Sequence, residues 1–202
     1  MIRIAKSKGV ILDNRHICDN KNRVAVFTEK YGKVVSFVTG YGKPASHWAG
    51  VFEGGNILEL SFLQRGTSYT VTGWEMIYQP PEKNIMDFAV RELILDATSE
   101  LVPLTDPDPG LFRWLIWCLR PFGGRKMYAY LARLIYRGGF LNFSDKMIMA
   151  ALDKNFEEFL AGSSPDELAK LLKREMNFIQ NFIGRPLKSY DFFKQTARGQ
   201  FA

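Results

Sequence analysis

The residues that could support catalysis are few and poorly arranged. The chain has two histidines, His16 and His47, and two cysteines, Cys18 and Cys118. His16 lies two residues from Cys18, with Asp13 nearby, which superficially resembles a nucleophile, a base and an orienting acid. All three fall in one short stretch between expected strands, so we interpret their proximity as coincidence. The sequence predicts no catalytic residues and no enzyme activity.

Motifs that bind nucleotides or metals, or that activate a serine, are also missing. The chain contains no phosphate loop of the Walker type, no His-Glu-x-x-His and no Gly-x-Ser-x-Gly. Gly40-Tyr41-Gly42 has two of the three glycines of a dinucleotide fingerprint but does not open a strand–helix–strand unit, which favours a loop turn. Four scattered histidines and cysteines do not suit a tetrahedral metal site. We therefore predict neither a cofactor nor a metal.

Positive charge is concentrated in two parts of the chain, which has a formal net charge of +6. Residues 1–50 carry nine basic and three acidic groups, and residues 113–146 carry seven basic groups and one acidic group. Each zone therefore has a charge of +6, and the remaining residues sum to −6. Two basic zones on an otherwise acidic chain predict two anionic partners or one long one.

The first basic zone interleaves cations with aromatic rings, a mixture that suits a nucleic-acid strand because cations contact phosphates and rings stack on bases. Phe27 and Phe37 are expected in the core of alternating strands. Tyr31, Tyr41 and Trp48 fall in expected turns, where they could contact bases. The candidate DNA-binding residues are Arg15, Lys21, Arg23, Lys33, Tyr41 and Lys43.

The second basic zone mixes tryptophans with arginines. An apolar groove with a basic rim would suit an acidic peptide that ends in a hydrophobic residue. A solvated basic face over a purely structural core explains the same pattern equally well. The candidate partner-binding residues are Arg113, Trp117, Arg125, Lys126 and Arg133, of which the last three are expected on the rim.

The elements that would position these groups change type near residue 80. Alternating apolar residues between turn residues predict strands over 2–12, 23–28, 34–39, 58–62 and 69–77. Five short strands without a long helix between them fit a small Greek-key barrel. Pro80 and Pro81 end this pattern, and helical spacing follows. We predict an α+β chain, with a five-stranded OB-fold barrel at 1–79 and an all-α helical domain at 82–202.

The clearest local signal marks the start of a helix in the second half. Ser164 followed by Pro165 and Glu167 has the residue types of a capping box with proline in the first turn, and Gly184 is expected to end this helix. Asp108 is expected to cap the helix that follows Gly110. Further helices are expected from residue 85 onward and over 111–119, 125–136, 144–162 and 188–196.

The sequence also predicts where the protein works. The longest apolar stretch, 111–119, has nine residues and includes Arg113, whereas a bilayer span needs about 20. The first twelve residues lack the continuous apolar core of a secretion signal. Two distant cysteines are typical of a reducing compartment. We expect a soluble, cytoplasmic protein with no membrane partner.

Several short motifs follow one another in the order and spacing of a known family. They are Phe27-Thr28-Glu29, Tyr31-Gly32-Lys33, Gly40, Ser46, Ile57-Leu58-Glu59-Leu60 and Tyr69-Thr70-Val71-Thr72, with looser landmarks at Tyr130-Leu131, Gly138-Gly139-Phe140 and Gly184-Arg185-Pro186-Leu187-Lys188-Ser189. On these residues the chain resembles the bacterial RecO family of DNA repair proteins, which act as recombination mediators. The resemblance is closest over residues 9–75 and extends over nearly the whole chain.

The resemblance implies a non-catalytic, nucleoid-associated protein of DNA repair and recombination. Such proteins bind single- and double-stranded DNA, anneal complementary strands and bind the acidic C-terminal tail of the single-strand binding protein (SSB). With RecR they help to load RecA onto SSB-coated DNA. An OB-fold RNA-binding module and a peptide-binding adaptor without a recombination role remain as alternatives.

Two departures from the family pattern affect these expectations. The family's Lys-Gly-Ala-Arg-Arg-Pro-Lys-Ser loop reads Thr39-Gly40-Tyr41-Gly42-Lys43-Pro44-Ala45-Ser46 here, with three fewer positive charges. We expect fewer phosphate contacts at this loop, with Tyr41 compensating by stacking. Some family members also carry a four-cysteine zinc site, but residues 140–143 contain no cysteine. The helical domain is therefore predicted to lack zinc.

Overall fold

The computed structural model describes residues 2–18, 21–39, 50–66, 68–81, 84–120, 124–139, 146–152 and 156–199. The chain divides into two compact units, one made of residues 1–81 and 102–120 and the other of residues 82–101 and 121–202. The first unit thus contains the expected barrel together with a later segment of the chain. The division into functional domains at residues 79 and 82 stays a prediction.

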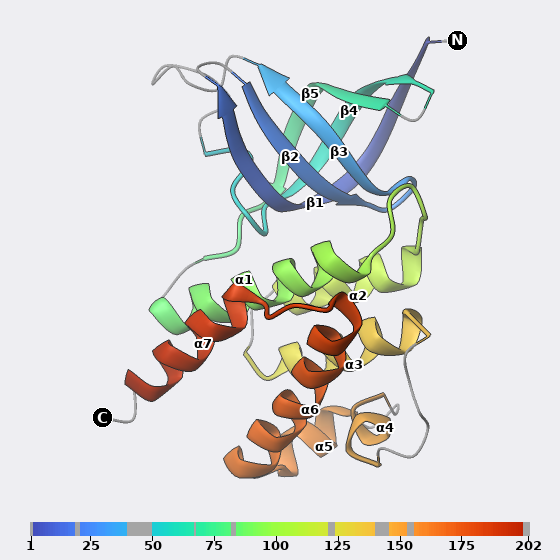
Figure 1. Ribbon diagram of the computed structural model, residues 1–202. Helices are drawn as coiled ribbons and strands as arrows, with labels where there is room; N and C mark the ends of the chain where they lie inside the picture. The colour runs from blue at the N-terminus through green and yellow to red at the C-terminus, as the bar shows by residue number, and fades with distance from the viewer. Residues whose placement is uncertain are drawn as a thin grey trace. The chain divides into compact units, whose positions relative to one another are not determined.

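The first unit is built on a closed five-stranded barrel (Figure 1). Its strands pair in the order β1-β2-β3-β5-β4. Their bounds are β1 (Ile2–Cys18), β2 (Lys21–Thr28), β3 (Gly32–Thr39), β4 (Ile57–Arg65) and β5 (Ser68–Tyr78). Seven helices complete the described chain. The predicted fold class, an OB-fold barrel followed by helices, is confirmed.

Strand β1 is longer than the sequence predicted because it pairs with two neighbours. Its first half lies beside β4 and its second half beside β2. The register shifts between Ile11 and Asp13 and again between His16 and Cys18, and such bulges bend a strand as a closed barrel requires. At Gly9, where both partners are in register, an added Cβ would lie 2.6 Å from Val26 Cγ1. A glycine is therefore required there.

The barrel closes through a short parallel contact between β3 and β5, in register at Ser36 and Tyr69. Buried Ser36 accepts a hydrogen bond on Oγ from the Val71 backbone N–H at 3.0 Å, so this inward polar side chain ties the closing strands together. The inward residues of the other strands form the apolar core, which includes Ile11, Val24, Val26, Val34, Val38, Leu58, Leu60 and Phe62.

Helix α2 (Pro109–Leu119) belongs to the same compact unit as the barrel. Asp108 caps it as expected, because Asp108 Oδ1 accepts a hydrogen bond from the Leu111 N–H at 2.8 Å. The Phe112 ring packs edge-on against the Phe27 ring of β2, with centroids 5.6 Å apart. Phe27 is fully buried, so its predicted core position is confirmed. This packing covers one end of the outer face of β2.

The second unit contains the other six helices: α1 (Ile85–Leu101), α3 (Lys126–Arg137), α4 (Lys146–Leu152), α5 (Phe156–Gly162), α6 (Pro165–Ile183) and α7 (Lys188–Gly199). One helix was expected over 144–162; the structure has α4 and α5 within this range, and residues 144–145 and 153–155 lie outside the described residues.

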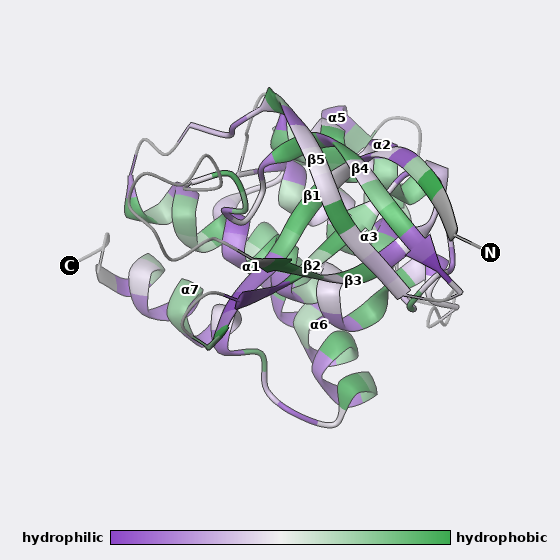
Figure 2. Ribbon diagram, turned by 90° about the horizontal axis from the view of Figure 1, so that it is seen from above, coloured by the Kyte–Doolittle hydropathy of each residue, from purple (hydrophilic) through white to green (hydrophobic). Residues whose placement is uncertain are grey.

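Helix α6 begins at the capping box that the sequence predicted. The Ser164 side chain accepts from the Glu167 N–H, and the Glu167 carboxylate accepts from the Ser164 N–H at 2.8 Å. Gly184 ends the helix with a φ of 70°. Hydrophobic and hydrophilic residues share its surface (Figure 2), and its buried positions repeat at helical spacing: Leu168, Leu171, Leu172, Glu175, Met176 and Ile179.

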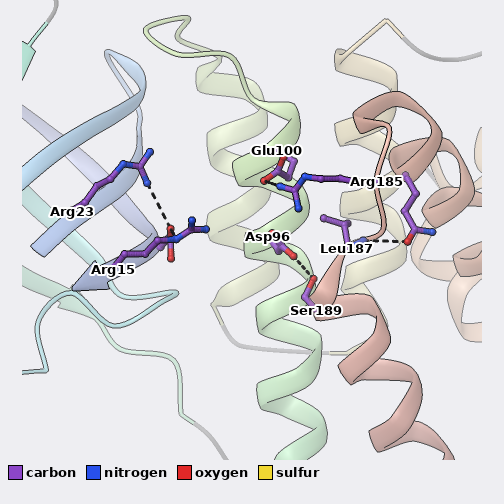
Figure 3. Close-up of polar contacts among 9 residues, drawn as sticks. Arg15, Arg23, Asp96, Glu100, Arg185, Leu187 and Ser189 are labelled. Atoms are coloured by element: carbon purple, nitrogen blue, oxygen red, sulfur yellow. Dashed lines mark hydrogen bonds and ion pairs between the residues drawn. The ribbon is translucent and has the colours of Figure 1, made fainter. Parts of the chain in front are cut away.

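Helix α7 and the segment before it pack along α1, and Figure 3 shows their polar contacts. Ser189 Oγ donates to Asp96 Oδ2 at 2.6 Å, and Arg185 Nη2 lies 2.7 Å from Glu100 Oε1. One turn further along α7, the Phe192 ring meets Phe88 edge-on at 5.9 Å. These contacts fix the end of the described chain within the second unit.

Candidate nucleic-acid interface

Three of the predicted DNA-binding residues lie close together on the outer face of β1 and β2. Arg15 of β1 is in register with Arg23 of β2, and Arg23 is in register with Phe37 of β3. Residues two apart on a strand point to the same face, so Lys21 lies on this face as well. We call Arg15, Lys21, Arg23 and Phe37 the β1–β3 outer patch.

Asp13 joins the two arginines of the patch. Its Oδ2 lies 2.6 Å from Arg15 Nε and 3.8 Å from Arg23 Nη1 (Figure 3). The side chain of Asp13 is 27% exposed, whereas that of Arg15 is 70% exposed and that of Arg23 38%. Both arginine side chains are therefore more exposed to solvent than the side chain of Asp13, which leaves them accessible to an external anion.

Phe37 supplies the patch with an aromatic ring. It is 43% exposed, and the Lys21 ammonium lies 4.3 Å from the ring centroid. The prediction that Phe37 belongs to the core is wrong. Val34, Ser36 and Val38 take the inward positions of β3, and the two-residue period then turns Phe37 outward. The sequence carries no clear signal for this ring, because Val34 and Val35 are adjacent and the inward position between Val34 and Val38 is taken by the polar Ser36.

A side-chain network lies at the same end of β1 and β2. Asn22 Nδ2 donates to Asn14 Oδ1 at 2.8 Å, and Asn22 Oδ1 lies 3.2 Å from His16 Nδ1. Asn22 is buried, and it occupies the strand position between Lys21 and Arg23. The network joins β1 to β2 beneath the patch. His16 thus contacts an amide while Asp13 pairs with arginines, an arrangement unlike a catalytic triad.

The other predicted DNA-binding residues lie apart from the patch or outside the described residues. Lys33 is in register with Phe27, at the opposite end of the β2–β3 pair, and its backbone carbonyl accepts from Thr105 at 2.9 Å. Tyr41 and Lys43, like Trp48, are among the residues that the structure does not describe. Tyr31 packs against Tyr69, with ring centroids 5.8 Å apart. The structure therefore gives Tyr31 a role in packing.

The five predicted partner-binding residues are divided between the two compact units. Arg113 and Trp117 are on α2, in the unit that contains the barrel, and Arg125, Lys126 and Arg133 are in the other unit. Arg113 is exposed on α2. Trp117 is half-buried and packs edge-on against the neighbouring Trp114, with centroids 5.1 Å apart. Arg113 is thus accessible beside a pair of indole rings.

Arg133 is not on a surface rim, contrary to the expectation from its spacing. It is only 8% exposed, and Arg133 Nη1 donates to the carbonyl oxygens of Ala129 at 2.9 Å and Ala151 at 2.8 Å. The guanidinium also lies over the Phe156 ring, 4.6 Å from its centroid. Burial lowers the pKa of Arg133 to about 10. These contacts make Arg133 part of the packing among α3, α4 and α5.

Arg125 and Lys126 lie at the start of α3 and are more accessible. Arg125 is exposed, and its Nη1 donates to the Leu160 carbonyl at the end of α5 at 2.9 Å. Lys126 is half-buried. The nearby Tyr128 phenol has a raised pKa, mainly because it is buried and secondly because of the negative charge of Glu175. Arg125 and Lys126 form a basic surface here, and it is smaller than the predicted one because Arg133 is buried.

No group of three or more histidine, cysteine, aspartate or glutamate side chains is arranged to hold a metal ion in the part of the chain that the structure describes. Within the same residues, no helix has both the length and the hydropathy that crossing a membrane would require.

The barrel is similar to a domain of known proteins. Residues 1–80 match the family model described as "Recombination protein O N terminal". The barrel is similar to the RecO N-terminal domain. The match covers all five strands and therefore the whole β1–β3 outer patch. The resemblance to RecO that the sequence motifs indicated is confirmed, together with its association with DNA repair and recombination proteins.

Curated relatives extend the similarity beyond the RecO N-terminal domain. "DNA repair protein RecO" of Prosthecochloris aestuarii (strain DSM 271 / SK 413) is 27% identical over 116 residues, which are 55% of this chain and 44% of the relative. The protein of that name from Syntrophobacter fumaroxidans (strain DSM 10017 / MPOB) is 24% identical over 149 residues, which are 72% of this chain and 58% of that relative. The Chloroherpeton thalassium (strain ATCC 35110 / GB-78) protein is 28% identical over 116 residues, 55% and 45%. The chain thus spans about half the length of these relatives.

Proposed function

We propose that this chain is a DNA-binding protein of recombinational repair that contacts single- and double-stranded DNA through the β1–β3 outer patch. The observation that carries the proposal is the juxtaposition of Arg15, Lys21, Arg23 and the exposed Phe37 on one face of a barrel similar to the RecO N-terminal domain. Arginine and lysine neutralise backbone phosphates, and an exposed ring stacks on an unpaired base. The patch offers both interactions side by side, because Arg15, Arg23 and Phe37 are in register across β1, β2 and β3.

The proposed activity requires binding alone. A protein that neutralises phosphates lowers the repulsion between two complementary strands, which promotes annealing without a covalent step. In this account the chain anneals strands and helps RecA to assemble on SSB-coated DNA without being an enzyme. Its place of action is the cytoplasm, at the nucleoid. The names of the relatives, DNA repair protein RecO, support the repair role, and the family description, "Recombination protein O N terminal", supports the recombination role.

The proposed protein partners are the C-terminal tail of SSB and RecR, with RecA engaged indirectly. An acidic tail that ends in proline and phenylalanine needs a guanidinium for its carboxylate and an apolar surface for its ring. Exposed Arg113 beside Trp117 on α2 is one candidate site with this chemistry, and Arg125 with Lys126 at the start of α3 is a separate candidate with positive charge. Arg133 is left out of this proposal because its guanidinium is buried.

The experiment that tests DNA binding is a salt titration of affinity for a fluorescent 20-nucleotide single strand. Each phosphate contact on a single strand contributes about 0.7 to the slope of log K against log salt. The double variant Arg15→Ala, Arg23→Ala is expected to lower this slope, by at most about 1.4. Lys170→Ala, Lys173→Ala is the matched control, because it removes two exposed cations from α6. Equal slopes in the two double variants would refute the proposal, and tighter binding of an RNA of the same sequence would favour an RNA-binding module.

A further inference from the structure

Arg15 and Arg23 stand directly opposite each other across the β1–β2 pair. Like charges in directly opposite positions destabilise a sheet. Asp13 offsets this repulsion, because one of its oxygens lies 2.6 Å from Arg15 Nε and 3.8 Å from Arg23 Nη1. The free protein thus already holds one anion between the two arginines of the patch.

A carboxylate oxygen between two guanidinium groups resembles a backbone phosphate oxygen in charge and in hydrogen-bonding chemistry. A nucleic-acid phosphate that approaches Arg15 or Arg23 therefore meets groups that Asp13 already engages. Phe37 is uncharged and 43% exposed, so an acid beside the arginines does not weaken stacking on its ring. Asp13 therefore weakens the phosphate contacts of the arginines and leaves stacking on Phe37 unchanged.

We infer that Asp13 is a specificity-determining residue, an internal anion that competes with DNA phosphates for Arg15 and Arg23. The inference rests on the proposed DNA-binding function and deepens it. By weakening the phosphate contacts, Asp13 makes binding depend more on stacking against Phe37. Stacking requires unpaired bases, whereas phosphates are present on both single strands and duplexes. Asp13 therefore favours single strands over duplexes.

The test compares Asp13→Asn with Glu75→Gln, an equal change of charge at an exposed carboxylate on β5. Affinity is measured over a range of salt concentrations for a single strand and for a duplex with the same number of phosphates. Asp13→Asn is expected to bind both DNAs more tightly than Glu75→Gln. The slope of log K against log salt for Asp13→Asn should steepen with each arginine that becomes available, by about 0.7 on the single strand and about 0.9 on the duplex. The ratio of single-strand to duplex affinity should fall.

A second comparison shows whether the effect acts through the arginines. In the Arg15→Ala, Arg23→Ala background, Asp13→Asn should change affinity no more than Glu75→Gln does. Thermal unfolding identifies folded variants, and Asp13→Ser provides the same test if Asp13→Asn does not fold. If Asp13→Asn binds DNA no more tightly than Glu75→Gln does, the inference is overturned. The proposed function still stands in that case, provided that the wild type has a steeper salt slope than the Arg15→Ala, Arg23→Ala variant. If the wild type and the Arg15→Ala, Arg23→Ala variant have the same salt slope, both the inference and the proposed function are overturned.

Discussion

Phe37→Ala tests the stacking half of the proposed interface. An aromatic side chain that stacks on one base contributes about 1–3 kcal/mol to binding of a single strand. Removal of the ring should therefore raise the Kd for a single strand by about 5- to 150-fold. The slope of log K against log salt should stay unchanged, because a neutral ring releases no counterions. A duplex keeps its bases paired, so its affinity should change little.

The effect on folding should be small enough to separate from the effect on binding. Full burial of a phenylalanine side chain is worth about 1.5–3 kcal/mol. Phe37 is 43% exposed in the free protein, so its loss should lower the free energy of unfolding by roughly 1–2 kcal/mol. The Lys21 ammonium, 4.3 Å from the ring centroid, loses its aromatic partner but keeps its charge. Denaturant unfolding measures this change independently of DNA.

The assay is fluorescence anisotropy with a labelled single strand and a duplex of equal phosphate number. Phe37→Trp preserves a stacking ring and is expected to retain wild-type affinity within about threefold, whereas Phe37→Leu preserves apolar volume but not the ring and should resemble Phe37→Ala. Equal losses of affinity on single strand and duplex, or a flatter salt slope for Phe37→Ala, would refute the reasoning. Either result would mean that the ring positions the neighbouring cations and does not stack.

The remaining predictions concern the fold and the partner surface. Gly32→Ala should destabilise the barrel by more than about 1–2 kcal/mol in denaturant unfolding, because Gly32 has a φ of 68° and an added Cβ would clash with the Asp106 backbone; wild-type stability would refute this. Hydrogen bonds from Ser164 hold the pKa of Glu167 below its usual value, so their stabilising effect is present above the unfolded-state pKa and is lost as pH falls through the folded-state pKa. In Ser164→Ala, NMR titration should show the Glu167 pKa rising toward its ordinary value, and an unchanged pKa would contradict the assignment. Arg113→Glu with Arg125→Glu should weaken binding of an acidic peptide ending in Pro-Phe while annealing of bare strands survives; if both fall together, these arginines bind DNA.

Local signals in the sequence predicted local structure well. The side chains of Ser164 and Glu167 cap α6 from positions three residues apart, and Asp108 caps α2 in the same way. Such interactions depend on neighbours in the chain, so residue type and spacing determine them. The turn at Gly32 and the proline pair at residues 80 and 81 likewise marked where the strands end.

Non-local packing explains what the sequence did not predict. Phe27 lies on β2 and Phe37 lies on β3, and the two side chains have the same chemistry. Only Phe27 is covered, because Phe112 from a later helix packs on it. Arg133 has the spacing of a surface arginine, but α4 and α5 provide a carbonyl and a ring that bury it. Cross-strand register brought Arg23 to the Asp13–Arg15 pair of β1, and register is not visible in a single sequence.

The most direct test of the central claim is NMR mapping of single-stranded DNA on the isotopically labelled protein. Backbone amide shifts on addition of a 20-nucleotide strand are expected to be largest at Arg15, Lys21, Arg23 and Phe37, and to decrease as salt is raised. Lys170 and Lys173 on α6 serve as internal controls and should shift little. Shifts concentrated on α3 and α6, with the β1–β3 outer patch unchanged, would contradict the account.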